Sequence, residues 1–381
     1  MPSMGDEERE ILRLFKKPIA SIPEVYGRLA VSLVRLREDF SILMNSLEEI
    51  KNKIGDNIRL KRIRVKKEPF GIEPKSLCVT GVDGTNRDKD LFGAYMGVTA
   101  AVAITAKGLQ DKNPRILADG DVFALSSGGI PKRTIDIRRH TGEIRVAIES
   151  IKKFNPDLVM LDGPLVFHDA LIPVRAFDSI EYWKAFARLV GLSDRFLKAS
   201  GLDPADLGIK PPSLFEELWK FSEEIPIVGI VKRVRATSLI KSHLPRKESD
   251  KAFNRGLCDV MILNEIMPTD GVTITPPMTV SRRSILSWHP AIAEKDVQSF
   301  YIRVGSSQPY RVEIPTKHLN MLEDIVSVIA ETACPTDGFP MYIHAAHNLC
   351  QIPPNFLDIS TNEIITHAAK DFRKIGLFTE R

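Results

Sequence analysis

Leu77-Cys-Val-Thr-Gly-Val-Asp-Gly-Thr-Asn-Arg-Asp88 is the stretch from which the rest of the chain can be interpreted. An apolar run typical of a β-strand ends at Asp83, and a turn is expected at Gly84, because glycine adopts backbone conformations that a Cβ disfavours. A carboxylate fixed at the inner edge of a sheet can hold a metal ion if further acids reach it. The simpler interpretation is an Asp-Gly hairpin turn without function. The strand-like segment 92–106 follows so closely that a hairpin is predicted in either case.

A second copy of this pattern favours the metal-binding interpretation. Asp157-Leu-Val-Met-Leu-Asp-Gly163 is again an apolar run that ends in Asp-Gly. Its four central residues show no alternation of apolar and polar side chains, which is typical of a strand buried on both faces. Asp83 and Asp162 therefore become candidates for one shared site.

Composition excludes several classes of protein. The net charge of +4 creates no global field that would require a polyanionic partner, although residues 51–67 are strongly basic. The four cysteines at 78, 258, 334 and 350 lack CxxC spacing, which argues against a zinc knuckle or a disulfide framework and fits a reducing compartment. The charged N-terminus predicts no signal peptide. The longest apolar run is shorter than the about 20 residues of a membrane helix. We expect a cytoplasmic protein with no membrane association.

The N-terminal part of the chain predicts one long helix. Pro23 suits a helix start. Apolar residues then recur at heptad spacing, which predicts a narrow apolar stripe: Leu29, Leu33, Leu36, Phe40, Leu43, Leu47, Ile50 and Ile54. The stripe could pack on its own domain or on a second subunit, and a heptad does not distinguish the two.

Residues 59–67 alternate basic and apolar side chains, which predicts a strand with a basic face. Such a strand could be a solvated sheet edge protected by lysines, which we favour. The alternative is a contact with a phosphate backbone.

The order of the remaining elements predicts an α/β fold with an RNase H-like core, a mixed five-stranded sheet flanked by helices. The expected order begins with three strands connected by short links, at 77–83, 92–106 and 114–124. A helix (137–154), a fourth strand (157–162), a mainly helical segment (164–224) and a fifth strand (225–231) follow. A hairpin and three helices are expected at 299–304 with 310–314, 317–333, 339–350 and 361–375. We expect an N-terminal helical and basic extension over 1–70, an RNase H-like domain over 71–355 with a helical insertion at 164–224, and a C-terminal helix over 356–381.

In an RNase H-like fold the first and fourth strands lie side by side, so that Asp83 and Asp162 would converge. Two adjacent carboxylates repel each other unless a cation lies between them. The preceding helix offers Glu143 or Glu149 as a third acid, and periodicity does not choose between them. Such an oxygen-rich cluster suits Mg²⁺ or Mn²⁺. Two ions about 3.5–4 Å apart can activate water and stabilise the leaving oxygen of a phosphodiester. We interpret Asp88 and Asp119 as turn residues.

At this point the sequence resembles the NurA nucleases. The resemblance covers residues 75–355 and rests on an ordered set of short motifs: Val82-Asp83-Gly84-Thr85, Glu143-Ile-Arg-Val-Ala147, Leu161-Asp162-Gly163-Pro164-Leu165, Gly229-Ile-Val-Lys232, Phe300-Tyr301-Ile302-Arg303, Gly338-Phe339-Pro340 and Ala346-His347. It implies an RNase H-like core, a homodimer and Mn²⁺-dependent DNA cleavage, with Mg²⁺ as the second choice. It also implies 5′ to 3′ exonuclease and single-strand endonuclease activities, exerted with a hexameric HerA-type translocase in the resection of double-strand breaks.

The resemblance also implies roles for individual residues. It selects Glu143 over Glu149, because an aliphatic residue and a short stretch to alanine follow the family's glutamate. The implied metal ligands are Asp83, Glu143, Asp162 and His347, and the further catalytic residues are Lys232, Tyr301 and Arg303. Lys232 would meet the scissile phosphate or position water, and Tyr301 and Arg303 would touch DNA or the leaving phosphate. His344 would share a helix face with His347.

Three interpretations compete. The first is a metal-dependent DNA nuclease working with a ring-shaped motor. The second is a non-catalytic dimeric clamp that loads a translocase on DNA; the presence of all three acids and the histidine favours the enzyme. The third is an actin-like phosphotransferase, which ranks last because the first hairpin, Asn86-Arg-Asp-Lys-Asp90, has no glycine-rich phosphate loop. One departure from the family is Pro164, which stands where a serine is more common and removes an N–H and a hydroxyl.

Overall fold

The computed structural model describes residues 23–55, 57–91, 94–126, 131–165, 180–191, 212–232, 236–280, 297–363 and 366. The chain forms two compact units. The smaller unit combines Met1–Arg59 with Val234–Met267, and the larger unit combines Leu60–Arg233 with Pro268–Arg381. The predicted C-terminal helix lies mostly outside the described residues.

The smaller unit is helical. Its long helix α2 (Pro23–Gly55) begins at the predicted proline and is joined by α8 (Ser238–His243), α9 (Arg246–Asn254) and α10 (Asp259–Ile266). The heptad stripe divides into two halves. Leu47, Ile50 and Ile54 are buried, whereas Leu36 and Phe40 are 63% and 60% exposed. The C-terminal half of the stripe therefore packs within its own unit.

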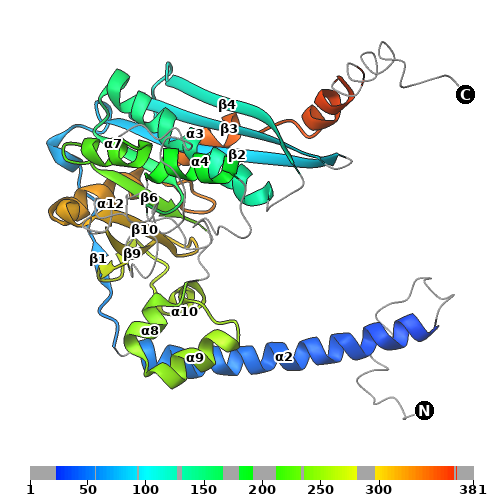
Figure 1. Ribbon diagram of the computed structural model, residues 1–381. Coiled ribbons are helices and arrows are strands. Elements are labelled where there is room, and N and C mark those ends of the chain that lie inside the picture. Colours follow the sequence, from blue (N-terminus) through cyan, green and yellow to red (C-terminus); the bar gives the residue numbers. More distant parts are fainter. Residues whose placement is uncertain are drawn as a thin grey trace, which may run out of the picture. The chain divides into compact units, whose positions relative to one another are not determined.

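The larger unit contains a long antiparallel meander (Figure 1) of β2 (Cys78–Leu91), β3 (Ala94–Lys107) and β4 (Arg115–Ser126). The predicted meander is confirmed, but the turn at Gly84 is wrong. β2 runs through Asp83 and Gly84 and stays paired with β3 as far as Leu91. Asp88 and Asp119 are likewise strand residues rather than turn residues. The strands are longer than predicted because cross-strand pairing stabilises polar residues that carry no apolar pattern.

The strand order confirms the RNase H-like core. After helix α3 (Pro131–Phe154), strand β5 (Leu158–Asp162) pairs in parallel with β2, and β6 (Ile227–Val231) pairs in parallel with β5. The five core strands thus lie in the order β6-β5-β2-β3-β4. The sheet continues beyond β6 to ten strands, through β10 (Tyr310–Pro315), β9 (Val297–Val304), β7 (Val272–Ile274) and β1 (Lys61–Ile63), with β8 (Met278–Thr279) on β9.

Helices cover both faces of this sheet. One apolar cluster joins the sheet to α3, α4 (Ile180–Val190) and α7 (Leu214–Phe221). A second apolar cluster joins the opposite face to α12 (Leu322–Glu331) and α13 (Met341–Leu349). Two short 3₁₀-helices, η1 (Pro69–Gly71) and η4 (Thr316–Met321), precede these helices in the chain. Helix α13 approaches β2 so closely that a Cβ on Gly81 would lie 2.5 Å from the Tyr342 backbone. This contact brings α13 to the strand that carries Asp83.

The basic stretch near β1 lies at the sheet edge, as the edge-strand interpretation expected. Only residues 61–63 of it form a strand. Three of its cations pair with acids of the same unit: Lys61 with Glu323, Arg62 with Asp270 and Lys66 with Asp324.

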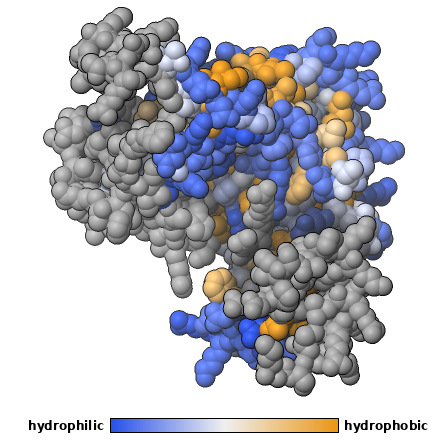
Figure 2. Space-filling view, turned by 90° about the vertical axis from the view of Figure 1, so that its right-hand side faces the viewer, coloured by the Kyte–Doolittle hydropathy of each residue, from blue (hydrophilic) through white to orange (hydrophobic). Residues whose placement is uncertain are grey.

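The surface seen in Figure 2 is largely hydrophilic between separate hydrophobic patches. None of the helices in the described ranges combines the length and apolar character of a membrane span.

Candidate metal centre

Asp83 and Asp162 lie side by side on neighbouring strands. The register pairs Val82 with Leu161, so the aspartates follow at the same level of the parallel β2–β5 pair. Asp83 is only 4% exposed, and its Oδ1 accepts a hydrogen bond from the Gly84 N–H at 2.7 Å. Burial, followed by the negative charge of Asp162, raises the pKa of Asp83 to about 6. The two carboxylates therefore interact directly.

Glu143 reaches the same place from α3. It is 6% exposed, and a Cβ on Gly84 would lie 2.6 Å from its Oε1. Burial alone would raise the pKa of this carboxyl, but Arg139 and His140 hold it below its usual range. Both belong to the same helix: Arg139 makes a short ion pair with Oε1, and His140 Nδ1 lies 2.9 Å from Oε2. Glu149, the alternative acid, is exposed and pairs with Lys153 at 3.3 Å.

Glu143 and Asp162 open onto one small cavity. Its volume is about 20 Å³, and Gly163, Pro164 and Phe215 contribute to its walls. A space of this size is sufficient for a single water molecule or ion.

Lys232 directly follows β6 and points its ammonium group at Asp162. The Nζ–Oδ2 distance is 2.7 Å, and both side chains are largely shielded from solvent. The same Nζ lies 5.6 Å from the ring centre of Phe339, a geometry that favours a cation–π interaction. The structure thus brings Lys232 to the carboxylates, as expected for a residue at the end of this strand.

His347 approaches Asp83 from α13. Its Nδ1 lies 2.7 Å from Asp83 Oδ2, and half of its side chain is exposed. Asp83, His347 and Cys350 form one group of potential ligands, whose donor atoms lie within 4.8 Å of one another. Burial raises the pKa of the Cys350 thiol to about 12, so this group is a neutral thiol near pH 7, and it donates to the His347 carbonyl.

His344 belongs to a different group. Its Nε2 lies 2.9 Å from Asp337 Oδ2, and Cys334 completes a separate cluster with these two residues. The one-turn spacing between His344 and His347 therefore does not place both imidazoles at Asp83.

Tyr301 and Arg303 lie further along the sheet. Their strand, β9, is separated from β5 by β10 and β6. They alternate with Phe300 and Ile302, which belong to the α12–α13 side, so Tyr301 and Arg303 face the α3 side. Tyr301 is fully buried and Arg303 is 5% exposed. The structure places them at the level of the strand ends, while the carboxylate cluster is three strands away.

Sequence reasoning missed two groups of supporting residues. Arg139 and His140 lie four and three positions before Glu143, the spacing at which helical side chains meet. Glu313, buried on β10, pairs with Arg311 and accepts the Leu165 N–H at 2.8 Å. This last bond fixes the segment after Asp162, where Pro164 has no N–H to offer. The helical spacing was visible in the sequence, whereas the link from Glu313 to Leu165 was not.

The donor set suits a divalent cation. Three carboxylates from three different elements, with one imidazole, are ligands that Mn²⁺ and Mg²⁺ accept. Burial and, after it, the negative charges of Asp162 and Glu143 raise the pKa of Asp83, and a cation between these carboxylates would relieve their repulsion. Asp83 and His347 offer donor atoms within 4.8 Å of each other, and Glu143 and Asp162 are the further candidates to hold the ion.

Comparisons with known proteins identify the family and the fold. The NurA domain profile matches residues 78–352. The structure of the NurA nuclease from Sulfolobus solfataricus is similar with a TM-score of 0.58 at 14% identity, covering 91% of this chain and 97% of that chain. A structure of NurA bound to dAMP and manganese is similar with a TM-score of 0.53 at 13% identity, covering 90% of this chain and 97% of that chain. At these identities the likeness concerns the fold. No curated protein matches the sequence.

Proposed function

Since the chain belongs to the NurA family of nucleases, we propose that it hydrolyses DNA as a metal-dependent phosphodiesterase. The observation that carries this proposal is the convergence of Asp83, Glu143 and Asp162 from β2, α3 and β5. Mn²⁺ is the expected ion, with Mg²⁺ as an alternative. Manganese and dAMP in a structurally similar NurA support this choice.

Each residue of the site has its own role in the proposed reaction. Divalent ions bound there would activate a water molecule and stabilise the leaving oxygen of the phosphodiester. His347 orients Asp83 through the 2.7 Å contact with Oδ2, and Arg139 and His140 keep Glu143 ionised and in place. Lys232 neutralises Asp162 in the resting protein and is positioned to turn its ammonium group to the scissile phosphate.

Tyr301 and Arg303 act at a greater distance in this proposal. Their strand is too far from the carboxylates for them to hold the ion, and because Tyr301 is fully buried and Arg303 is 5% exposed, a contact with the DNA strand or the released phosphate requires their surroundings to open. Arg303 is buried and would supply a fixed positive charge.

The finer role follows the family. We assign 5′ to 3′ exonuclease and single-strand endonuclease activities, a hexameric HerA-type partner, a homodimer, a cytoplasmic location and a function in double-strand break resection. The exposed Leu36 and Phe40 of α2 support a contact with a second subunit, because large apolar side chains in one stripe are typical of interfaces. Leu36→Glu should shift the protein toward monomer in light scattering; an unchanged mass would remove this stripe from the dimer contact.

A non-catalytic DNA clamp is the second candidate. It is favoured by the internal cations that already neutralise two of the acids, Lys232 on Asp162 and Arg139 on Glu143. Calorimetric titration of the metal-free protein with Mn²⁺ separates the two functions, because the clamp requires no ion at this site.

Digestion of a labelled DNA duplex tests the enzyme directly. The intact protein should cleave with Mn²⁺, more weakly with Mg²⁺, and not with chelator. Asp83→Asn should abolish cleavage while the circular dichroism spectrum stays unchanged. Chelator-resistant cleavage, or full activity of the variant, would contradict the proposed site.

A further inference from the structure

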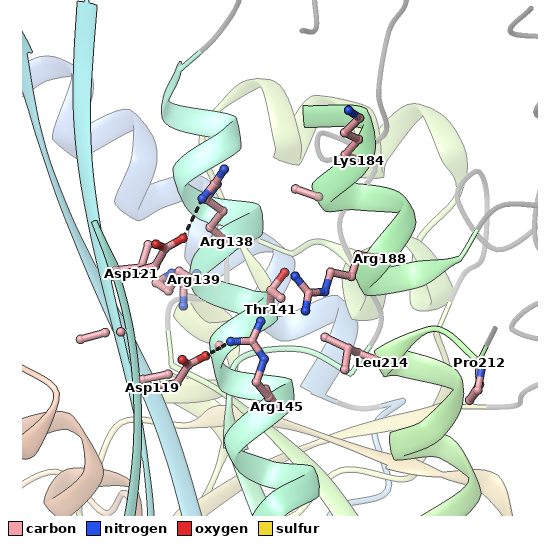
Figure 3. A pocket seen from close by; sticks show the side chains of 16 residues that line it. Asp119, Asp121, Arg138, Arg139, Thr141, Arg145, Lys184, Arg188, Pro212 and Leu214 are labelled. Atoms are coloured by element: carbon pink, nitrogen blue, oxygen red, sulfur yellow. Dashed lines mark hydrogen bonds and ion pairs between the residues drawn. The ribbon is translucent and has the colours of Figure 1, made fainter. Parts of the chain in front are cut away.

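A large hollow lies beside the metal centre, between α3, α4 and the β3–β4 hairpin. Its volume is about 750 Å³, within the range of roughly 300–1,000 Å³ that encloses organic ligands. Five cationic side chains line it (Figure 3): Arg138, Arg139, Arg145, Lys184 and Arg188. Arg188 extends from α4 toward Thr141 and Arg145 of α3.

The floor of this pocket is built from small residues. Ala100, Ala101, Gly120 and Gly142 line it, and a Cβ on Gly142 would lie only 3.2 Å from the Ala101 Cβ. Small residues at the floor let α3 approach the hairpin closely while the long cationic side chains form the walls. The pocket therefore exists because small residues in its lining leave the space between the long cationic side chains unfilled.

The charges in the pocket are unbalanced. Asp121 pairs with Arg138 at 2.6 Å, and Asp119 pairs with Arg145 at 2.5 Å. These pairs hold the two arginines in place. Among the described residues no carboxylate pairs with Lys184 or Arg188, and both side chains are exposed. Two cations thus remain available to an anionic ligand.

Arg139 connects the pocket to the metal centre. It lines the pocket and at the same time makes the ion pair with Glu143. The pocket and the carboxylate cluster are therefore separated by about the length of the Arg139 side chain. A polyanion whose phosphate lies at the carboxylates would extend into the pocket.

We propose that this pocket, here called the α3–α4 pocket, binds the sugar-phosphate backbone of single-stranded DNA that leads to the scissile phosphate. The inference rests on the proposed nuclease function. Arginine and lysine are the usual partners of backbone phosphates. None of the described lining residues is aromatic, so contacts to the backbone phosphates should dominate and binding should be largely independent of sequence. A volume of about 750 Å³ is of the size that a few nucleotides of a single strand would occupy.

The binding experiment uses the full chain in EDTA, so that it does not depend on cleavage. Anisotropy of a short fluorescent oligothymidylate is measured over a range of salt concentrations. Lys184→Gln with Arg188→Gln should weaken binding about tenfold at low salt. It should also reduce the slope of log K against log salt by ~1.4, because each phosphate contact with a single strand contributes about 0.7.

A charge-matched control is Lys75→Gln with Lys112→Gln, two exposed lysines outside the pocket. This control should keep the affinity and salt slope of the wild-type protein. Equal affinities and slopes for the pocket variant, the control and the wild type would overturn the inference.

A cleavage experiment distinguishes this inference from the proposed function. Turnover of an oligonucleotide is divided by turnover of a small aryl phosphodiester, which is too short to reach the pocket. The ratio should fall about tenfold in the pocket variant. A wild-type protein that hydrolyses neither substrate with Mn²⁺ would contradict the nuclease assignment, whereas the binding experiment in EDTA would still decide the inference. A ratio equal to that of the wild type would overturn the inference alone.

Discussion

Two Asp-Gly pairs at the metal centre, Asp83-Gly84 and Asp162-Gly163, share a sequence but not an environment. Asp83 is buried beside His347, and its pKa is raised to about 6. Asp162 instead pairs with the Lys232 ammonium at 2.7 Å. One carboxylate therefore experiences mainly burial and like charge, while its neighbour has a cation of its own.

The glycines differ as much as the aspartates do. Gly84 lies in the middle of β2, and a Cβ there would collide with Glu143. Gly163 has a φ of +133° and open space around its Cα, so its role is conformational. The same dipeptide therefore meets two different structural requirements. At Gly84 the missing side chain lets a third acid approach closely, and at Gly163 it lets the chain turn sharply at the end of the strand.

Removing either carboxylate should have the largest effect. Asp83→Asn and Asp162→Asn are each expected to reduce Mn²⁺-dependent cleavage by about a thousandfold or more, because each removes a charged ligand. Single-turnover assays measure the loss. Asp270→Asn, at an exposed ion pair with Arg62, is the matched control and should retain wild-type rates. Retained activity in either site variant would separate that aspartate from the metal centre.

The glycines provide the next test. Gly84→Ala should lower turnover by on the order of a hundredfold, because the new methyl group displaces Glu143 from the site. Gly163→Ala meets no neighbour, so its main cost should be backbone strain of about 1–3 kcal/mol in the free energy of unfolding. Parallel thermal melts and rate measurements compare them. A smaller loss of turnover for Gly84→Ala than for Gly163→Ala would refute the steric interpretation.

The contrast in environment also predicts a pH dependence. The folded-state pKa of Asp83 is raised above the unfolded value, so its neutral form stabilises the metal-free fold at low pH. This stabilisation is fully present below about pH 4 and is lost as the pH rises through about 6, on the order of 2–3 kcal/mol. Urea unfolding in EDTA should therefore show that wild-type protein loses stability relative to Asp83→Asn over this interval. Parallel curves for the two proteins would contradict the raised pKa.

The smallest effect on metal binding and turnover is expected for a substitution of Lys232. Lys232→Gln removes the ammonium group that competes for Asp162, so Mn²⁺ should bind severalfold more tightly in calorimetry while turnover falls. The matched control is Lys152→Gln, which breaks an exposed ion pair with Glu217 elsewhere in the unit and should leave the affinity as it is. Weaker Mn²⁺ binding in Lys232→Gln would show that the lysine supports the metal centre instead of competing with it.

Much of the core fold was predictable, because each element carried its own local pattern. The buried runs that became β5 and β6, the helical periodicity of α3 and the heptads of α2 were all visible in the chain. The extension of β2 past Asp83 was not visible, since Thr85–Leu91 is polar and gains its strand conformation only from pairing with β3. The alternation of basic and apolar residues indicated β1, whereas the additional strands β7 and β8 are too short to carry a pattern.

By itself, the sequence determined which residues could hold a metal and which strands would carry them, because side-chain chemistry and periodicity are local properties. Tertiary structure alone decided how each candidate is used. Glu149 pairs with Lys153 on the surface, His344 turns to Asp337, and Tyr301 lies three strands from the carboxylates. The charge state of Asp83 also depends on the fold, since burial and the field of Asp162 arise only when strands 79 residues apart in sequence pair side by side.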